Sequence, residues 1–80
     1  MAIVLERELK VSDLQDRQSA VIKAVVGSDE VQERFFELGC IPGTEVTLLS
    51  RVSMGGPAII EIRGCRIAIR RNDLNHLLVY

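Results

Sequence analysis

The sequence predicts a small, mainly β barrel that carries one α-helix. Three observations predict it: short apolar runs alternate with turn signals, glycine and proline stand where tight turns need them, and only one stretch has helical periodicity. With 80 residues, 48% of them hydrophobic, the chain is long enough for one domain. We expect a single domain over residues 1–80, with 1–8 as a flexible leader. We also expect about five strands in a closed or nearly closed sheet, which would leave no exposed edge.

The first predicted strand and the helix follow each other directly. The strand is Ser19–Val26, and Gly27 ends it. With a period of two, one side of it carries Ala20, Ile22, Ala24 and Val26, and the other side carries Val21, Lys23 and Val25. Ser28 is suited to cap a helix that runs to about Leu38, with acidic residues in the first turn where the helix dipole favours them. Gly39 supplies the left-handed residue that ends a helix. The helix is therefore expected between the first two strands.

Tight turns define the rest of the sheet. Pro42 and Gly43 fit the central positions of a type II turn, because proline presets the first φ and glycine accepts a positive second φ. After this turn we expect a strand from Thr44 to about Val52. A hairpin of Ala58–Arg63 and Arg66–Arg70 follows, with Gly64–Cys65 as its type II′ turn. The chain is then expected to form a helical turn at 71–74 capped by Asn72 and a last strand from Leu77 to Tyr80.

The segment Ser53-Met54-Gly55-Gly56-Pro57 cannot be regular sheet and is expected to form a loop. It is rich in glycine, but it lacks the Lys-Ser or Lys-Thr that follows in a phosphate-binding loop. One interpretation is a flexible crossing between strands, and the functional one is a surface loop that contacts a partner.

The charge of the chain restricts its partners. A formal net charge of −1 argues against nucleic acid as the main partner, since phosphate binding needs a cationic excess. The segment Val46–Tyr80 has two acids and five arginines, so it is mildly basic. This excess fits either a solvated surface or docking to an acidic partner or to anionic headgroups. Neither a membrane span nor a secretory signal is visible, which favours the cytoplasm without membrane insertion.

Few residues are suited to catalysis or to metal binding. The only histidine is His76, so a catalytic triad or dyad would depend on it, and we expect no enzyme and no cofactor. Cys40, Cys65 and His76 are soft ligands that suit zinc or ferrous iron, but they come from distant segments without ligand spacing. The alternative for both cysteines is that they pack as small apolar side chains.

Three motifs resemble the FeoA family in their order and spacing. Arg34–Val46 contains Leu-Gly, two further residues and Pro-Gly, as at the end of that family's helix. Met54–Pro57 resembles its Leu-Gly-Asp-Pro loop, with Gly56 where aspartate is frequent, and Gly64–Arg71 resembles its glycine hairpin and arginine-terminated strand. The resemblance covers about Leu9 to Tyr80.

This resemblance implies an SH3-like barrel and a cytosolic accessory of FeoB, the membrane protein that carries a G-protein domain and moves ferrous iron. The chain would act by binding FeoB, and its location would be the cytoplasm or, through its partner, the inner face of the membrane. The alternatives are a metal sensor or carrier, and a stand-alone domain related to iron- and manganese-dependent repressors. Spare apolar residues also allow a homo-oligomer. The residues expected to contact the partner are Phe36, Pro42, Gly43, Met54, Gly55, Gly56, Pro57, Arg66 and Arg70.

Overall fold

The computed structural model describes residues 8–51 and 54–80, so most of the expected leader at 1–8 lies outside the described residues. The elements in chain order are β1 (Leu9–Lys10), the 3₁₀ turn η1 (Val11–Asp13), β2 (Gln18–Val25), α1 (Asp29–Glu37), β3 (Glu45–Arg51), β4 (Ala58–Ile62), β5 (Cys65–Ile69), the 3₁₀ helix η2 (Arg71–His76) and β6 (Leu77–Val79).

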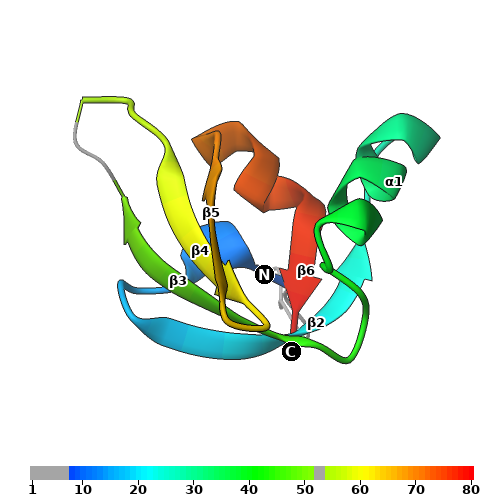
Figure 1. Cartoon of the computed structure of the whole chain (residues 1–80), viewed down its shortest axis with the longest axis horizontal. Coiled ribbons are helices and arrows are strands. Elements are labelled where there is room, and N and C mark those ends of the chain that lie inside the picture. The colour runs from blue at the N-terminus through cyan, green and yellow to red at the C-terminus, as the bar shows by residue number, and fades with distance from the viewer. Residues whose placement is uncertain (1–7, 52–53) are drawn as a thin grey trace, which may run out of the picture.

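All the strands described belong to one antiparallel sheet in the order β1-β6-β2-β3-β4-β5. The sheet curls strongly, with α1 to one side and the long β3–β4 hairpin reaching away on the other (Figure 1). Its two end strands, β1 and β5, do not pair with each other. Of the predicted closed or nearly closed sheet, closure is therefore wrong, and within the described residues β5 keeps an unpaired edge.

The number of strands also differs from the prediction of about five. The additional strand is β1, in which Leu9 pairs with Val79 and Lys10 with Leu78. Two residues are too few to show a period in the sequence, and only the position of β6 makes them a strand. As a consequence, α1 lies between the second and third strands in chain order, and not between the first and second.

The helix begins and ends at the residues that the sequence predicts. The Ser28 hydroxyl accepts a hydrogen bond from the Val31 amide at 3.2 Å. At the other end Gly39 has φ 93°, and the amides of Gly39 and Cys40 donate to the carbonyls of Phe36 and Phe35. These two hydrogen bonds form the Schellman motif, which satisfies carbonyls that the helix leaves free.

The two tight turns differ in how well the sequence predicts them. Gly43 has φ 92° and the Thr44 amide donates to the Ile41 carbonyl at 3.0 Å, which confirms the type II turn. In the β4–β5 hairpin the loop residues are Arg63 and Gly64, both with positive φ, so the turn is type I′. The predicted Gly64–Cys65 turn is thus wrong by one residue, and Cys65 belongs to β5.

Polar contacts hold the η1 segment to β3 and to η2. Arg51 donates to the carbonyls of Ser12 and Leu14 at 2.8 and 2.6 Å, and the Ser12 hydroxyl donates to Asn75 at 2.7 Å. The second segment is longer than predicted, and it begins after Arg70 with no side-chain cap, so the predicted Asn72 cap is wrong.

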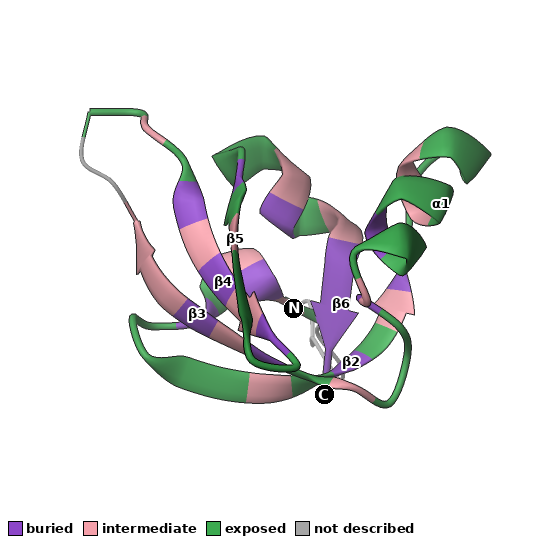
Figure 2. Ribbon diagram, viewed as in Figure 1, coloured by how far each residue is buried: buried purple, intermediate pink, exposed green. Residues whose placement is uncertain are grey.

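The core is formed by inward residues from every strand of β2–β6 together with Phe35 of α1 (Figure 2). Cys40 and the buried residues Val11, Leu14 and Leu74, in or next to the 3₁₀ segments, complete it. Strict alternation is clearest in β4, where Ala58, Ile60 and Ile62 are buried and the two residues between them are half-buried. The fully buried side chains with the largest volume are Ile22, Leu48, Ile60, Ile62, Leu74, Leu77, Val11, Val46 and Cys40.

Candidate partner-binding surface

The residues predicted to contact a partner do not lie on one surface. The first group lies where α1 passes into the type II turn, and we call it the helix-end patch: Phe36, Leu38, Ile41, Pro42 and Gly43. Its apolar members are exposed, Phe36 by 43%. The turn is fixed to β2, because the Gly43 amide donates to the Ile22 carbonyl at 2.8 Å. This patch is an exposed apolar surface on a rigid turn.

The second group surrounds the β3–β4 loop, and we call it the loop patch: Met54, Gly55, Gly56, Pro57 and Arg70. A hollow on this side is lined by Gly55, Gly56, Pro57 and Arg70, together with Arg71 and Asn72 of η2. Met54 is fully exposed and has φ 64°, which is uncommon for a side chain of its size. The loop lies far from α1 in Figure 1, so the helix-end and loop patches are separate.

Arg66 belongs to neither patch. It extends from the outward side of β5 and forms an exposed ion pair with Glu61 of β4 at 3.7 Å. It lines a different hollow, with Arg17, Leu49, Ser50 and Ile59. Sequence reasoning singled out Arg66 but missed Arg17 and Ile59, because their common position depends on how the strands pair.

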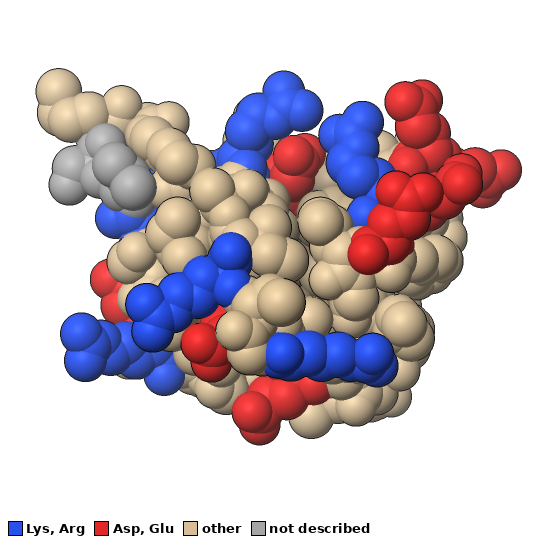
Figure 3. Space-filling model, viewed as in Figure 1, with Lys and Arg blue, Asp and Glu red and all other residues tan. Residues whose placement is uncertain are grey.

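Acidic side chains gather over α1 (Figure 3). They are Asp29, Glu30, Glu33 and Glu37, all exposed, and Arg34 is paired with Glu30 at 3.9 Å. Arginines lie mainly on the sheet and at its turns. The charge asymmetry of the sequence therefore appears in space as an acidic helix and a mixed, arginine-rich sheet surface.

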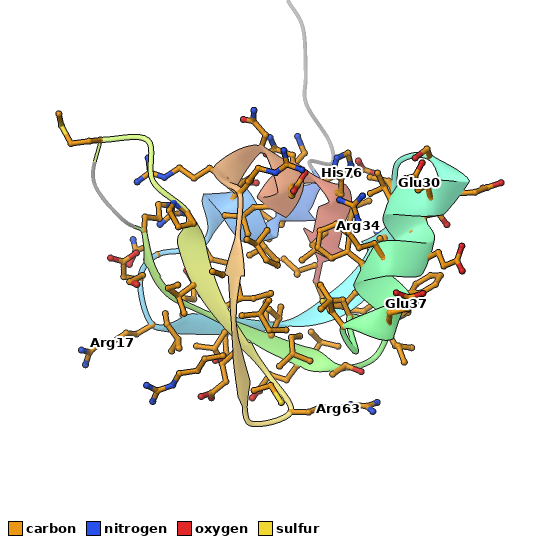
Figure 4. All side chains as sticks on the ribbon, turned by 45° about the horizontal axis from the view of Figure 1, so that its top comes forward. Arg17, Glu30, Arg34, Glu37, Arg63 and His76 are labelled. Carbon is orange, nitrogen blue, oxygen red and sulfur yellow. The ribbon has the colours of Figure 1, made fainter. Side chains whose placement is uncertain are left out.

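The three candidate metal ligands lie in different environments. Cys40 is buried in the core, Cys65 is exposed on β5, and His76 is half-buried at the end of η2 with its ring 6.4 Å from that of Phe35. Figure 4 shows His76 on the side of the molecule that faces α1. Within residues 8–51 and 54–80 no three histidine, cysteine or acidic side chains are placed to hold a metal ion. The same residues contain no helix long and apolar enough to cross a membrane.

Burial of Cys40 gives a testable pH dependence. Desolvation raises the pKa of its thiol from 9.0 to about 11. Above pH 9 the unfolded chain loses this proton while the folded chain keeps it, so stability is complete below pH 9 and falls as the pH rises to about 11. We expect a loss of about 2–3 kcal/mol across that interval, at about 1.4 kcal/mol per pH unit.

The measurement is urea unfolding at pH 7, 9 and 11 of the parent chain and of Cys40→Ala. Other groups titrate in this range, so the Cys40 contribution is the difference between the two pH profiles. Cys65→Ala is the matched control, because it removes an exposed cysteine and leaves the buried Cys40 in place. If the free energy of unfolding of the parent chain and of Cys40→Ala changed with pH in the same way, the raised pKa of Cys40 would be contradicted.

Comparison with known proteins adds a family and a fold. The FeoA domain family model matches residues 9–80. No curated protein matches the chain significantly. Similar solved structures include FeoA of Stenotrophomonas maltophilia, with 26% identity, TM-score 0.77, and 90% of this chain and 89% of that chain covered. That protein was solved with zinc and is described as a prokaryotic SH3 domain protein and a candidate activating factor of ferrous iron transport.

Two further structures are similar over most of this chain. FeoA of Chlorobium tepidum is 25% identical with TM-score 0.82, and 90% of this chain and 69% of that chain are covered. A manganese-dependent transcriptional repressor is 11% identical with TM-score 0.79, and 90% of this chain but 40% of the repressor are covered. The repressor shows that the fold is shared and nothing about function.

Proposed function

Because the chain belongs to the FeoA domain family, we propose that it is an accessory protein of ferrous iron uptake that binds a FeoB-type membrane transporter from the cytoplasmic side. The observation that carries this proposal is the family match over residues 9–80, together with the similarity to a FeoA that is described as a candidate transport activating factor. The proposed role is recognition without chemistry on a substrate.

Binding alone is sufficient to regulate a transporter. A protein that binds one conformation of the G-protein or pore domain more tightly than another shifts the population toward that conformation. The size of the shift is limited by the difference between the two affinities, so the accessory protein must contact a part of the transporter that moves.

The helix-end patch and the loop patch are the proposed contact surfaces. Phe36 offers an aromatic ring beside a turn of fixed shape, and such rings contribute strongly to binding because they bury area at a small entropic cost. The loop patch offers a fully exposed methionine, which adapts to irregular surfaces. Because the two patches are separate, they could contact two parts of a large partner.

The test is a binding measurement between the full chain and detergent-solubilised FeoB from the same genome, without nucleotide, with GDP and with a GTP analogue. We expect binding whose affinity depends on the nucleotide. Phe36→Ala should weaken it about tenfold or more if this ring is an anchor. The control is Glu30→Gln, an exposed position in the first turn of the same helix, six residues before Phe36 and on a different face of the helix. Absence of binding in all three nucleotide states, and also in membranes, would contradict the proposal.

A further inference from the structure

Two arginines and two aliphatic side chains surround a hollow on the outer face of the sheet. We call this surface the arginine face: Arg17, Leu49, Ser50, Ile59 and Arg66, which together line the hollow. Arg17 precedes β2, Leu49 and Ser50 are in β3, and Ile59 and Arg66 come from β4 and β5. The face therefore exists only because β2, β3, β4 and β5 are neighbours in the sheet.

The apolar part of this face is not part of the core. Ile59 is on the outward side of β4, between the buried Ala58 and Ile60, and it pairs with Ala68, which is exposed. Leu49 lies at an irregularity where the β3–β4 register shifts between Leu48 and Ser50. Such bulges redirect a side chain. Two half-buried aliphatic side chains are thus turned outward where the stability of the core does not need them.

Arg17 occupies a backbone conformation that favours other residues. Its φ is 69°, in the left-handed region, where a side chain with a Cβ is strained and glycine is not. The conformation is held from both sides, because the Arg17 amide donates to the Leu48 carbonyl at 2.5 Å and the Gln18 amide to the Gln15 carbonyl at 3.0 Å. An arginine at this position costs stability relative to glycine.

Nearby acids leave the positive charge of this face available. Asp16 is bound by Arg51 at 3.1 Å, and no acid within the described ranges forms an ion pair with Arg17. Arg66 pairs with Glu61 at 3.7 Å, but its side chain is 75% exposed, and such exposed pairs are weak enough to be exchanged.

From these observations we infer that the arginine face binds an acidic segment of a partner protein, with carboxylates at Arg17 and Arg66 and an apolar side chain over Leu49 and Ile59. Charge complementarity selects the acidic partner, and the aliphatic floor selects a peptide over a phosphate chain. The inference names a contact surface for the transporter proposed above and in that respect rests on that proposal.

Arg17→Gly and Arg63→Gly form a matched pair of variants. Arg63 is also an exposed arginine at positive φ, 51°, but it lies in the β4–β5 turn, well apart from Arg17 (Figure 4). Both substitutions remove one positive charge and relieve the same kind of strain, so both should raise the urea midpoint of unfolding. Only Arg17→Gly should lower the affinity for the acidic partner segment, by about threefold or more at low salt.

The first probe is a blocked peptide of alternating glutamate and leucine, titrated into the isotopically labelled chain and followed by amide chemical shifts. We expect salt-sensitive shifts at the arginine face, smaller in Arg17→Gly than in Arg63→Gly, and weaker binding of a glutamate–serine peptide. The inference would be overturned by shifts that are absent or lie elsewhere, or by equal losses of peptide binding in the two variants. It would also be overturned if the glutamate–serine peptide bound as well as the glutamate–leucine peptide, or if the chain preferred phosphatidylserine vesicles.

The second probe is solubilised FeoB, and it separates the two proposals. If the parent chain and Arg17→Gly bind FeoB equally, the arginine face is not the contact and the inference fails while the proposed function stands. If the peptide binds at the arginine face and FeoB does not bind at all, the surface assignment stands and the proposed partner fails.

Discussion

Replacing Ile60 by alanine should lower the free energy of unfolding by about 3 kcal/mol. Ile60 is fully buried in the middle of β4 and belongs to the core cluster. The substitution removes three methyl or methylene groups and leaves a cavity that neighbouring strands cannot fill without breaking their register, and comparable substitutions cost about 2–5 kcal/mol. In a domain of this size such a loss is a large part of the total stability. Urea unfolding at pH 7 measures it.

Ile59→Ala is the matched control for this experiment. The residue is the same, it lies one position away in the same strand, and its side chain points outward. Because it is half-buried and outside the core cluster, we expect a loss of about 1 kcal/mol or less. Equal losses at the two positions would mean that β4 does not alternate as described.

Replacing Gly27 by alanine should cost about 3 kcal/mol for a different reason. Gly27 has φ 121°, and a Cβ there would lie 2.9 Å from His76 Nδ1 and 3.2 Å from Val31 Cγ1. The strained backbone contributes about 1–2 kcal/mol, and the forced shift of packed neighbours adds a comparable amount. Thermal and urea unfolding would both show the loss.

Gly43→Ala separates the two contributions. Gly43 has φ 92°, but nothing lies within 4 Å of a Cβ built there, so only the backbone term of about 1–2 kcal/mol applies. His76→Ala should bring the cost of Gly27→Ala close to that of Gly43→Ala, as a double-mutant cycle would show. If His76→Ala leaves the cost unchanged, contact with the imidazole is not its cause.

The local elements of this fold were predictable because local chemistry decides them. Ser28 and Gly39 mark the ends of α1 through hydrogen bonds within a few residues, and the Pro42–Gly43 turn needs only its own backbone. The β4–β5 turn was misplaced by one residue because both Arg63-Gly64 and Gly64-Cys65 are possible loop residues, and the pairing of Ile62 with Cys65 selects between them.

The grouping of surface residues was not predictable in the same way. Of the residues predicted to contact a partner, Gly55, Gly56, Pro57 and Arg70 line one hollow, whereas Phe36 and Arg66 lie elsewhere. Arg17 carries no signal in the sequence, since its left-handed φ is imposed by the contact with Leu48 in a neighbouring strand. Arg51 likewise appeared as an ordinary strand residue, although its side chain fastens the η1 segment to β3.

By itself, the sequence determined where the helix begins and ends, most of the strands, and the family, since each follows from short-range preferences or from motifs in a fixed order. Only the tertiary structure decided that the sheet stays open, that Leu9–Lys10 becomes a strand, and that Arg17, Ile59 and Arg66 share one face. The physical reason is that strand pairing joins residues far apart in the chain, and its register depends on the whole sheet.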